Sequence, residues 1–209
     1  EASRREYEET HRRFQELERE LLTLKEYPAV TRDGRKIELS ANVKTPEDSE
    51  LALAKGAKGV GLYRTEWFFL TRDALPSEEE QVHQYEQIAR AIAPDPVIFR
   101  ALDIGGDKFA SYLGPGKSEL NPFLGWRAIR FCLQQRDIFR EQLRAILRAS
   151  AHGNVKMMYP MISGLDELNQ ANALVAEFKE ELRQEGLAFD EHLEIGAMNL
   201  GPDLSGDGK

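Results

Sequence analysis

The feature that most constrains this chain is a regular alternation of short apolar runs with longer helical patterns. The apolar runs hold β-branched and aromatic residues and end at glycine, proline or charged residues, which is typical of buried strands. Strands are predicted at 39–43, 59–63, 96–100, 155–162 and 193–198, and helices at 47–55, 78–93, from 121 on, and at 164–185. This alternation predicts βα units and a parallel sheet.

Local signals mark the ends of these elements. Thr45 followed by Pro46 is a helix start, and the run from Ser77 to Glu80 has the pattern of a capping box. Gly186 ends the last helix. The pair at 33–34, Asp-Gly, predicts the turn of a short hairpin ahead of the first core strand.

The first 26 residues have the pattern of an amphipathic helix with a narrow apolar seam. The seam consists of Tyr7, Phe14 and Leu21 in one row and Leu17 and Leu24 in a second. It fits either a surface helix packed on the domain or a connecting helix whose other end lies outside this chain. The pattern begins without a capping residue, which favours the connector.

Composition excludes several classes of protein. The net charge of −8 argues against a nucleic-acid partner, and no apolar run approaches the ~20 residues that cross a bilayer. The single cysteine, Cys132, rules out an internal disulfide framework, fits a cytoplasmic protein and is predicted to pack in the core. None of the four histidines has the spacing of a metal ligand.

Charged residues follow two successive strands at the same end of the predicted sheet. Arg64 and Arg100 lie at the carboxyl ends of these two predicted strands. Paired guanidinium groups bind phosphate or carboxylate through bidentate hydrogen bonds. Glu66 and Asp103 are predicted to orient them, and Arg127 is a candidate third donor. The predicted ligand is a small anion with a phosphate group; the alternative is salt bridging that only closes the strand ends.

Five motifs then stand in order along the chain. They are G-V-G-L-Y-R-T-E-W at 59–67, L-P-S-E-E-E-Q at 75–81, R-A-L-D-I-G-G-D-K at 100–108, N-P-F-L-G-W-R-A-I-R at 121–130 and Q-L-R-A-I-L-R-A-S-A-H-G at 142–153. Together they closely resemble the Enzyme I family, the phosphoenolpyruvate–protein phosphotransferases of the bacterial sugar phosphotransferase system. Multiphosphoryl transfer proteins share these motifs and remain an alternative. A phosphoenolpyruvate-utilising synthase or dikinase fits less well, because the motif around Trp126 and the first helix resemble those of Enzyme I.

The resemblance implies the fold and the domain boundaries. In that family this region begins the C-terminal phosphoenolpyruvate-binding domain, a (β/α)₈ TIM barrel. A whole barrel takes ~250 residues, so we expect an incomplete one, with about the first five βα units. Residues 1–27 are then the connector helix, 28–200 the partial barrel domain, and 201–209 a tail of unknown origin.

The resemblance also implies a reaction and its residues. Arg64 and Arg100 match the two arginines that hold the substrate phosphate, and Arg127 matches a further active-site arginine. The reaction implied is transfer of phosphoryl from phosphoenolpyruvate to a histidine, assisted by magnesium, in sugar transport. Catalysis of this kind rests mainly on positioning and charge neutralisation.

The sequence departs from the family pattern where the metal should bind. Leu200 stands in the register of the glutamate that ligates magnesium. The second ligand, an Asn-Asp pair, lies on a strand that we expect this chain to lack, as do another arginine, the cysteine proton donor and the phosphohistidine segment Thr-Ser-His. We therefore expect no magnesium site, no catalytic residue and no complete active site here. A non-catalytic half-barrel that binds a partner or assembles is the alternative.

The expected partners follow from the same resemblance. They are phosphoenolpyruvate and, in the full-length family, the phosphohistidine domain and the histidine phosphocarrier protein. A half-barrel leaves its inner face without cover, with Ile98, Met158 and Ile195 among its residues. We therefore expect a homo-oligomer, most simply a two-fold dimer.

Overall fold

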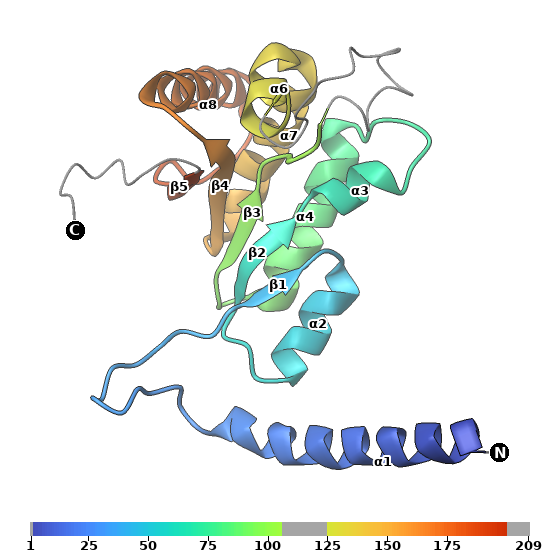
Figure 1. Ribbon diagram of the computed structural model, residues 1–209. Coiled ribbons are helices and arrows are strands. Elements are labelled where there is room, and N and C mark those ends of the chain that lie inside the picture. The colour runs from blue at the N-terminus through green and yellow to red at the C-terminus, as the bar shows by residue number, and fades with distance from the viewer. Residues whose placement is uncertain (1, 106–124, 200–209) are drawn as a thin grey trace.

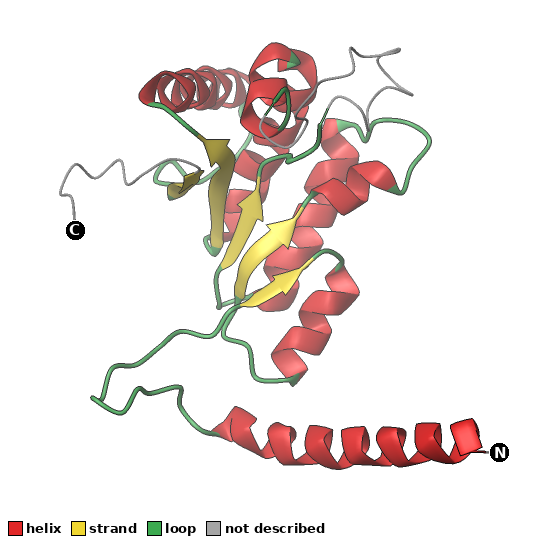
Figure 2. Ribbon diagram, in the orientation of Figure 1, coloured by secondary structure: helices red, strands yellow, loops and turns green. Residues whose placement is uncertain are grey.

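The computed structural model describes residues 2–105 and 125–199 and shows one parallel sheet with helices beside it (Figures 1 and 2). The strands are β1 (Ala41–Val43), β2 (Val60–Arg64), β3 (Val97–Arg100), β4 (Val155–Ile162) and β5 (Ile195–Asn199). They lie in chain order, and every neighbouring pair is parallel. Sequential parallel strands joined through helices are the units of a (β/α) barrel, so the predicted α/β fold of an incomplete barrel is confirmed.

The helices begin and end close to the residues that the sequence predicts. They are α1 (Ala2–Thr23), η1 (Leu24–Glu26), α2 (Pro46–Ala54), α3 (Glu66–Leu70), α4 (Glu78–Ile92), α6 (Ala128–Gln134), α7 (Arg136–Ala149), η2 (Ser150–His152) and α8 (Leu165–Glu185). Thr45 with Asp48, and Ser77 with Glu80, form complete capping boxes. An isolated bridge between Val30 and Lys36 confirms the short hairpin.

Two local differences from the sequence expectation matter for the site. The short helix α3 follows β2 directly, although no helix is predicted there. The helical region from 121 on divides at Gln135, whose backbone (φ −96°, ψ 65°) is not helical, into α6 and α7. The break lets α7 take its own direction along the sheet while α6 stays near the end of β3.

The entry to β2 depends on a glycine. Gly59 has φ +117°, and a Cβ atom there would lie 2.5 Å from the backbone oxygen of Pro96. Both the backbone angle and the close approach exclude a larger residue. Gly59 therefore lets β2 and β3 begin side by side.

The core between sheet and helices is aromatic at its centre. The Tyr63 and Phe99 rings lie 5.3 Å apart, and Tyr85 of α4 packs against both, at 6.5 and 4.8 Å. All three are fully buried. Because side chains alternate along a strand, the residue after each of Tyr63 and Phe99 must face away from the helices.

Arginines and glutamates spaced four residues apart join α7 to its neighbours. Toward α8 the ion pairs are Arg136–Glu177, Arg140–Glu181 and Arg144–Glu185, and toward α4 they are Arg144–Glu78, Arg148–Glu78 and Arg148–Glu79. Residues four apart share one face of a helix, so each row lies along one interface. The constant offset shows that α7 and α8 run parallel, as helices of successive βα units do.

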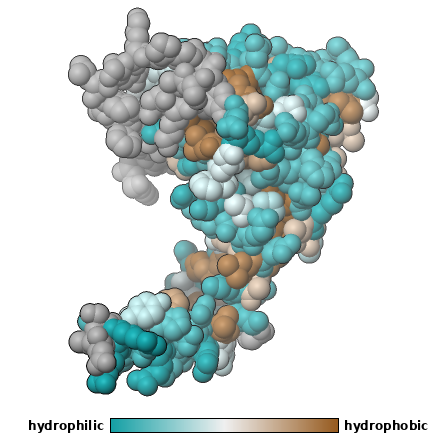
Figure 3. Space-filling view, turned by 90° about the vertical axis from the view of Figure 1, so that its right-hand side faces the viewer, coloured by the Kyte–Doolittle hydropathy of each residue, from teal (hydrophilic) through white to brown (hydrophobic). Residues whose placement is uncertain are grey.

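Helix α1 lies apart from the sheet (Figure 1). Its apolar seam faces solvent, with Tyr7 70% and Phe14 62% exposed. Glu18 reaches Lys55 of α2 at 3.5 Å, and apolar side chains gather where the helix meets the rest of the molecule (Figure 3). Within the described ranges, no helix has the length and apolar character needed to span a membrane.

Candidate anion-binding site

Two arginines lie level with each other at the carboxyl edge of the sheet. Arg64 ends β2, Arg100 ends β3, and the two are direct partners in the parallel register. Partners in register point to the same side of a sheet, which here is opposite to Tyr63 and Phe99. In parallel α/β folds this carboxyl edge is where ligands bind.

Arg100 is held by two carboxylates, one at the start of α3 and one in the loop after β3. Its Nη2 lies 3.0 Å from Oε1 of Glu66, and its Nη1 lies 3.3 Å from Oδ2 of Asp103. The side chains are only 13%, 12% and 11% exposed. The backbone N–H of Asp103 also donates to Glu66 at 3.0 Å, so the same carboxylate fixes both the guanidinium and the loop after β3.

Arg127 joins this network from the start of α6. Its Nη2 lies 2.8 Å from Oδ1 of Asp103. A backbone bridge between Gly105 and Arg127, and the N–H of Ala128 donating to Ile104 at 3.1 Å, hold the two segments together. Ala128 has φ +53°, a left-handed backbone that is uncommon for alanine and costs energy. That unfavourable turn aims Arg127 back at Asp103.

A buried hydrogen-bond chain supports the network from the helix side. The Thr65 hydroxyl donates to the carbonyl of Arg100 at 2.9 Å, and Gln142 of α7 donates to Thr65 at 3.1 Å. Gln142 also accepts from the backbone N–H of Leu102 at 2.9 Å. Sequence reasoning missed both polar residues. Gln142 had a usable signal, because the helical period places it on the same buried face as Phe139 and Leu143.

Arg64 differs from the other two arginines. It is exposed, and no carboxylate in the described part of the chain pairs with it. It lines a cavity of about 440 Å³ together with Asn42 and Lys44 from the end of β1. Arg64 is therefore the guanidinium that stands ready for an anion from solvent.

The charges of the buried part of the site balance. Arg100 and Arg127 face Glu66 and Asp103, so two positive groups meet two carboxylates. Burial raises the pKa of Glu66 above its usual range, and the neighbouring Arg100 offsets only part of that rise. An incoming anion would therefore interact most favourably with Arg64, because at Arg100 and Arg127 it competes with the carboxylates of Glu66 and Asp103.

The described residues do not fit a magnesium site. Magnesium needs several free carboxylate oxygens in octahedral geometry, but both oxygens of Asp103 and Oε1 of Glu66 already contact guanidinium or backbone N–H groups. No group of three potential ligands was found among residues 2–105 and 125–199. Leu200, which stands in the register of the expected magnesium ligand, lies outside the described residues. So do residues 106–124, which include the start of the 121–130 motif, and the tail at 201–209.

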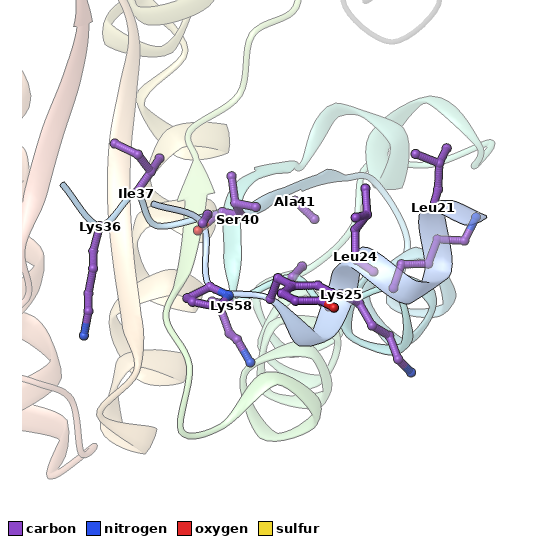
Figure 4. Close-up of a pocket in the computed structure, with 16 residues that line it drawn as sticks. Leu21, Leu24, Lys25, Lys36, Ile37, Ser40, Ala41 and Lys58 are labelled. Atoms are coloured by element: carbon purple, nitrogen blue, oxygen red, sulfur yellow. The ribbon is translucent and has the colours of Figure 1, made fainter. Parts of the chain in front are cut away.

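Two other features are separate from this site. A cavity of about 540 Å³ lies between the end of α1, the hairpin and α2 (Figure 4). It borders Ser40 and Lys58, which precede β1 and β2, so it lies at the amino edge of the sheet, with Leu21 and Leu24 on one side and Lys36 and Ile37 on the other. Cys132 is buried, its thiol donates to the carbonyl of Leu102 at 3.5 Å, and burial raises its pKa, as expected for a packed rather than a reactive thiol.

Comparisons with known proteins show the family to which the chain belongs. The family model described as "PEP-utilising enzyme, PEP-binding domain" matches residues 18–202. Curated relatives named phosphoenolpyruvate-protein phosphotransferase include proteins from Bacillus sp. (strain S), Haemophilus influenzae and Bacillus subtilis. They are 48%, 48% and 46% identical over 192, 179 and 194 residues, which is 92%, 86% and 93% of this chain.

These matches cover only part of each relative. The aligned region is 33%, 31% and 34% of the three proteins, so the chain spans about a third of the length of the curated relatives it matches. The family of the described domain is therefore clear, whereas the activity of a whole phosphotransferase is a separate question.

Proposed function

The chain belongs to the family of PEP-utilising enzymes, within their PEP-binding domain, and from this premise we propose that it is part of a phosphoenolpyruvate–protein phosphotransferase whose Arg64, Arg100 and Arg127 bind phosphoenolpyruvate. The observation that carries the proposal is the register of Arg64 with Arg100 at the carboxyl edge of the sheet. Two guanidiniums at one level suit the several oxygens of a phosphate group.

The residues divide the work of binding. Arg64 makes the first contact, because it is exposed and has no carboxylate partner among the described residues. Arg100 provides a second guanidinium whose position Glu66 and Asp103 fix before the ligand arrives. Arg127 reaches the same loop through Asp103. This arrangement neutralises charge and orients the ligand, which is the larger part of catalysis in phosphoryl transfer.

The finer parts of the function extend beyond this chain. Transfer to a histidine, magnesium assistance, a cytoplasmic place in sugar transport, and contact with a phosphohistidine domain and phosphocarrier protein are proposals for the longer protein. We propose that this chain alone binds phosphoenolpyruvate through these arginines and does not turn it over.

The test is a titration of the 209-residue chain with phosphoenolpyruvate and with inorganic phosphate, followed by backbone NMR. We expect both ligands to shift amide signals at the ends of β2 and β3. Arg64→Gln should weaken binding by roughly tenfold, the loss of one charge-assisted hydrogen-bond pair. Arg90→Gln is the control, because Arg90 is an exposed arginine in the last turn of α4. Equal affinities for the two variants would refute the proposal.

A second candidate function is assembly without catalysis. The observation in its favour is the solvent-facing seam of α1, where Leu17, Leu21 and Leu24 are each more than half exposed. A helix with such a seam gains stability by pairing with another apolar surface. The two functions are compatible, since the seam is remote from the carboxyl edge of the sheet (Figure 1).

A further inference from the structure

A third cation stands beside the two arginines of the carboxyl edge. Val43 is the register partner of Tyr63, so Lys44, the next residue, follows β1 at the level where Arg64 follows Tyr63 and Arg100 follows Phe99. Lys44 therefore continues the same row across three neighbouring strands. Nothing in the sequence motifs or in the comparisons assigns it a role.

The side chain of Lys44 has a defined place. Its amino group lies 4.7 Å from the centre of the Trp67 ring, in the geometry of a cation–π contact. Trp67 is 45% exposed and follows Glu66, the residue that holds Arg100. The aromatic ring thus positions the ammonium group without neutralising its charge.

The surroundings of Lys44 leave that charge available. No carboxylate among the described residues forms an ion pair with Lys44. Asp48, four residues after Lys44, uses its Oδ2 to accept from the backbone N–H groups of Lys44 and Thr45, at 3.3 and 3.2 Å, where it caps α2. Lys44 and Arg64 line the same cavity of about 440 Å³.

We propose that Lys44 is a further binding residue of this site, which acts with Arg64 on one small anion that carries a phosphate or carboxylate group. The inference rests on the proposed function. It adds one binding residue, and it places part of the bound anion on the β1 side of the arginine pair. An arriving anion draws the ammonium group away from the indole ring, so binding at Lys44 has an optical signal at Trp67.

The experiment compares four variants of the full chain in titrations with phosphoenolpyruvate and with inorganic phosphate. They are Lys44→Gln, Lys44→Arg, Arg64→Gln and Lys58→Gln. Lys58 is the matched control, because it is exposed but precedes β2 at the opposite edge of the sheet. Affinity is read from amide shifts, and the ring contact from tryptophan fluorescence, with Trp67→Phe defining the part of the signal that comes from Trp67.

We expect Lys44→Gln to weaken binding about three- to tenfold and to abolish the ligand-dependent change at Trp67. Lys44→Arg should restore most of the affinity, and Lys58→Gln should bind like the parent chain. If Lys44→Gln binds like the parent while Arg64→Gln does not, the inference is wrong and the proposed function stands. If the parent chain and Arg64→Gln show the same absence of binding, the proposed function fails and the inference with it.

Discussion

At the scale of single residues, the candidate site is organised by polar groups that contact one another. Glu66 accepts from Arg100 and from the backbone of Asp103, and Gln142 links helix α7 to Thr65 and Leu102. Each of these groups is largely shielded from water, where an unpaired polar atom is costly.

Replacing Gln142 should destabilise the protein without changing its charge. Gln142→Leu keeps the side-chain volume but leaves the Leu102 N–H without its acceptor and the Thr65 hydroxyl oxygen without its donor. We expect a loss of about 1–3 kcal/mol in the free energy of unfolding, measured by urea denaturation. Gln134→Leu, at an exposed position at the end of α6, is the control and should change stability little. Equal midpoints for the two variants would contradict the role of Gln142.

Glu66 should give the protein a stability that falls as pH rises. Its folded-state pKa lies above the ordinary value of 4.5, because burial outweighs Arg100, so the folded state holds the proton more tightly than the unfolded state. The stabilisation is complete below pH 4.5 and is lost as pH rises through the raised pKa. Glu66→Gln removes this dependence.

The measurement is the difference in unfolding free energy between the parent chain and Glu66→Gln from about pH 4.5 to 7.5. We expect the parent chain to lose unfolding free energy relative to Glu66→Gln as pH increases. Other carboxylates, such as Glu167 and Glu191, whose pKa values are lowered, cancel because both proteins contain them. A difference that is constant, or that favours the parent chain at higher pH, would show that Arg100 dominates over burial.

At the scale of elements, helix α7 is joined to α4 and α8 by rows of ion pairs. The arginines of these pairs differ in how deeply they are buried. Arg144 is 4% exposed and meets Glu78, Glu181 and Glu185, which are 16%, 29% and 45% exposed. Arg136, two turns earlier, is 56% exposed and pairs with Glu177. Burial rather than the number of pairs decides what such contacts contribute.

This contrast predicts different costs for the same substitution along one helix. Arg144→Met removes a buried cation and leaves three carboxylates without it, for a loss of about 2–3 kcal/mol, below the ~3–5 kcal/mol of fully buried pairs because the glutamates keep some water. Arg136→Met should cost less than about 1 kcal/mol. Urea unfolding of both variants tests the order, and a larger effect at Arg136 would overturn it.

At the scale of the whole molecule, the exposed large apolar side chains of the described residues lie mostly in the segment from α1 to the hairpin before β1. Ile98, Met158 and Ile195, which were expected to line an uncovered inner face, are half-buried, whereas Tyr7, Phe14 and Leu21 are more than half exposed. Self-association of the chain stays a prediction. The exposed seam of α1 makes that helix the expected contact surface, in place of the sheet.

Sedimentation velocity across micromolar concentrations tests this prediction. We expect the parent chain to gain mass with concentration, and the double variant Phe14→Glu with Leu21→Glu to remain a monomer, because charges cannot enter an apolar seam. Arg12→Glu with Arg19→Glu, spaced by the same seven residues but outside the seam, should behave like the parent. If the seam variant still associates, the contact surface is not α1, and the inner face of the sheet becomes the expected contact surface again.

Much of the fold and part of the candidate site could be predicted from the sequence, because those features depend on residues close together in the chain. Capping at Thr45 and Ser77 and the alternation of strands and helices are local patterns of hydrogen bonding and burial. The placement of Arg64 and Arg100 at one edge follows from parallel strands, which all end on the same side. Local hydrogen-bonding patterns, together with the rule that parallel strands end at one edge of the sheet, were sufficient to predict these features.

Only the tertiary structure decided which groups meet. Arg127 reaches Asp103 from 24 positions away, and Gln142 reaches Thr65 from 77 positions away. Lys44 stands level with Arg64 only because β1 pairs with β2 in one register. Such contacts depend on how helices pack across the sheet and on the exact register of neighbouring strands, and a pattern read within one element contains neither. The sequence by itself therefore determined the elements and the edge, and packing determined the partners that make the edge a site.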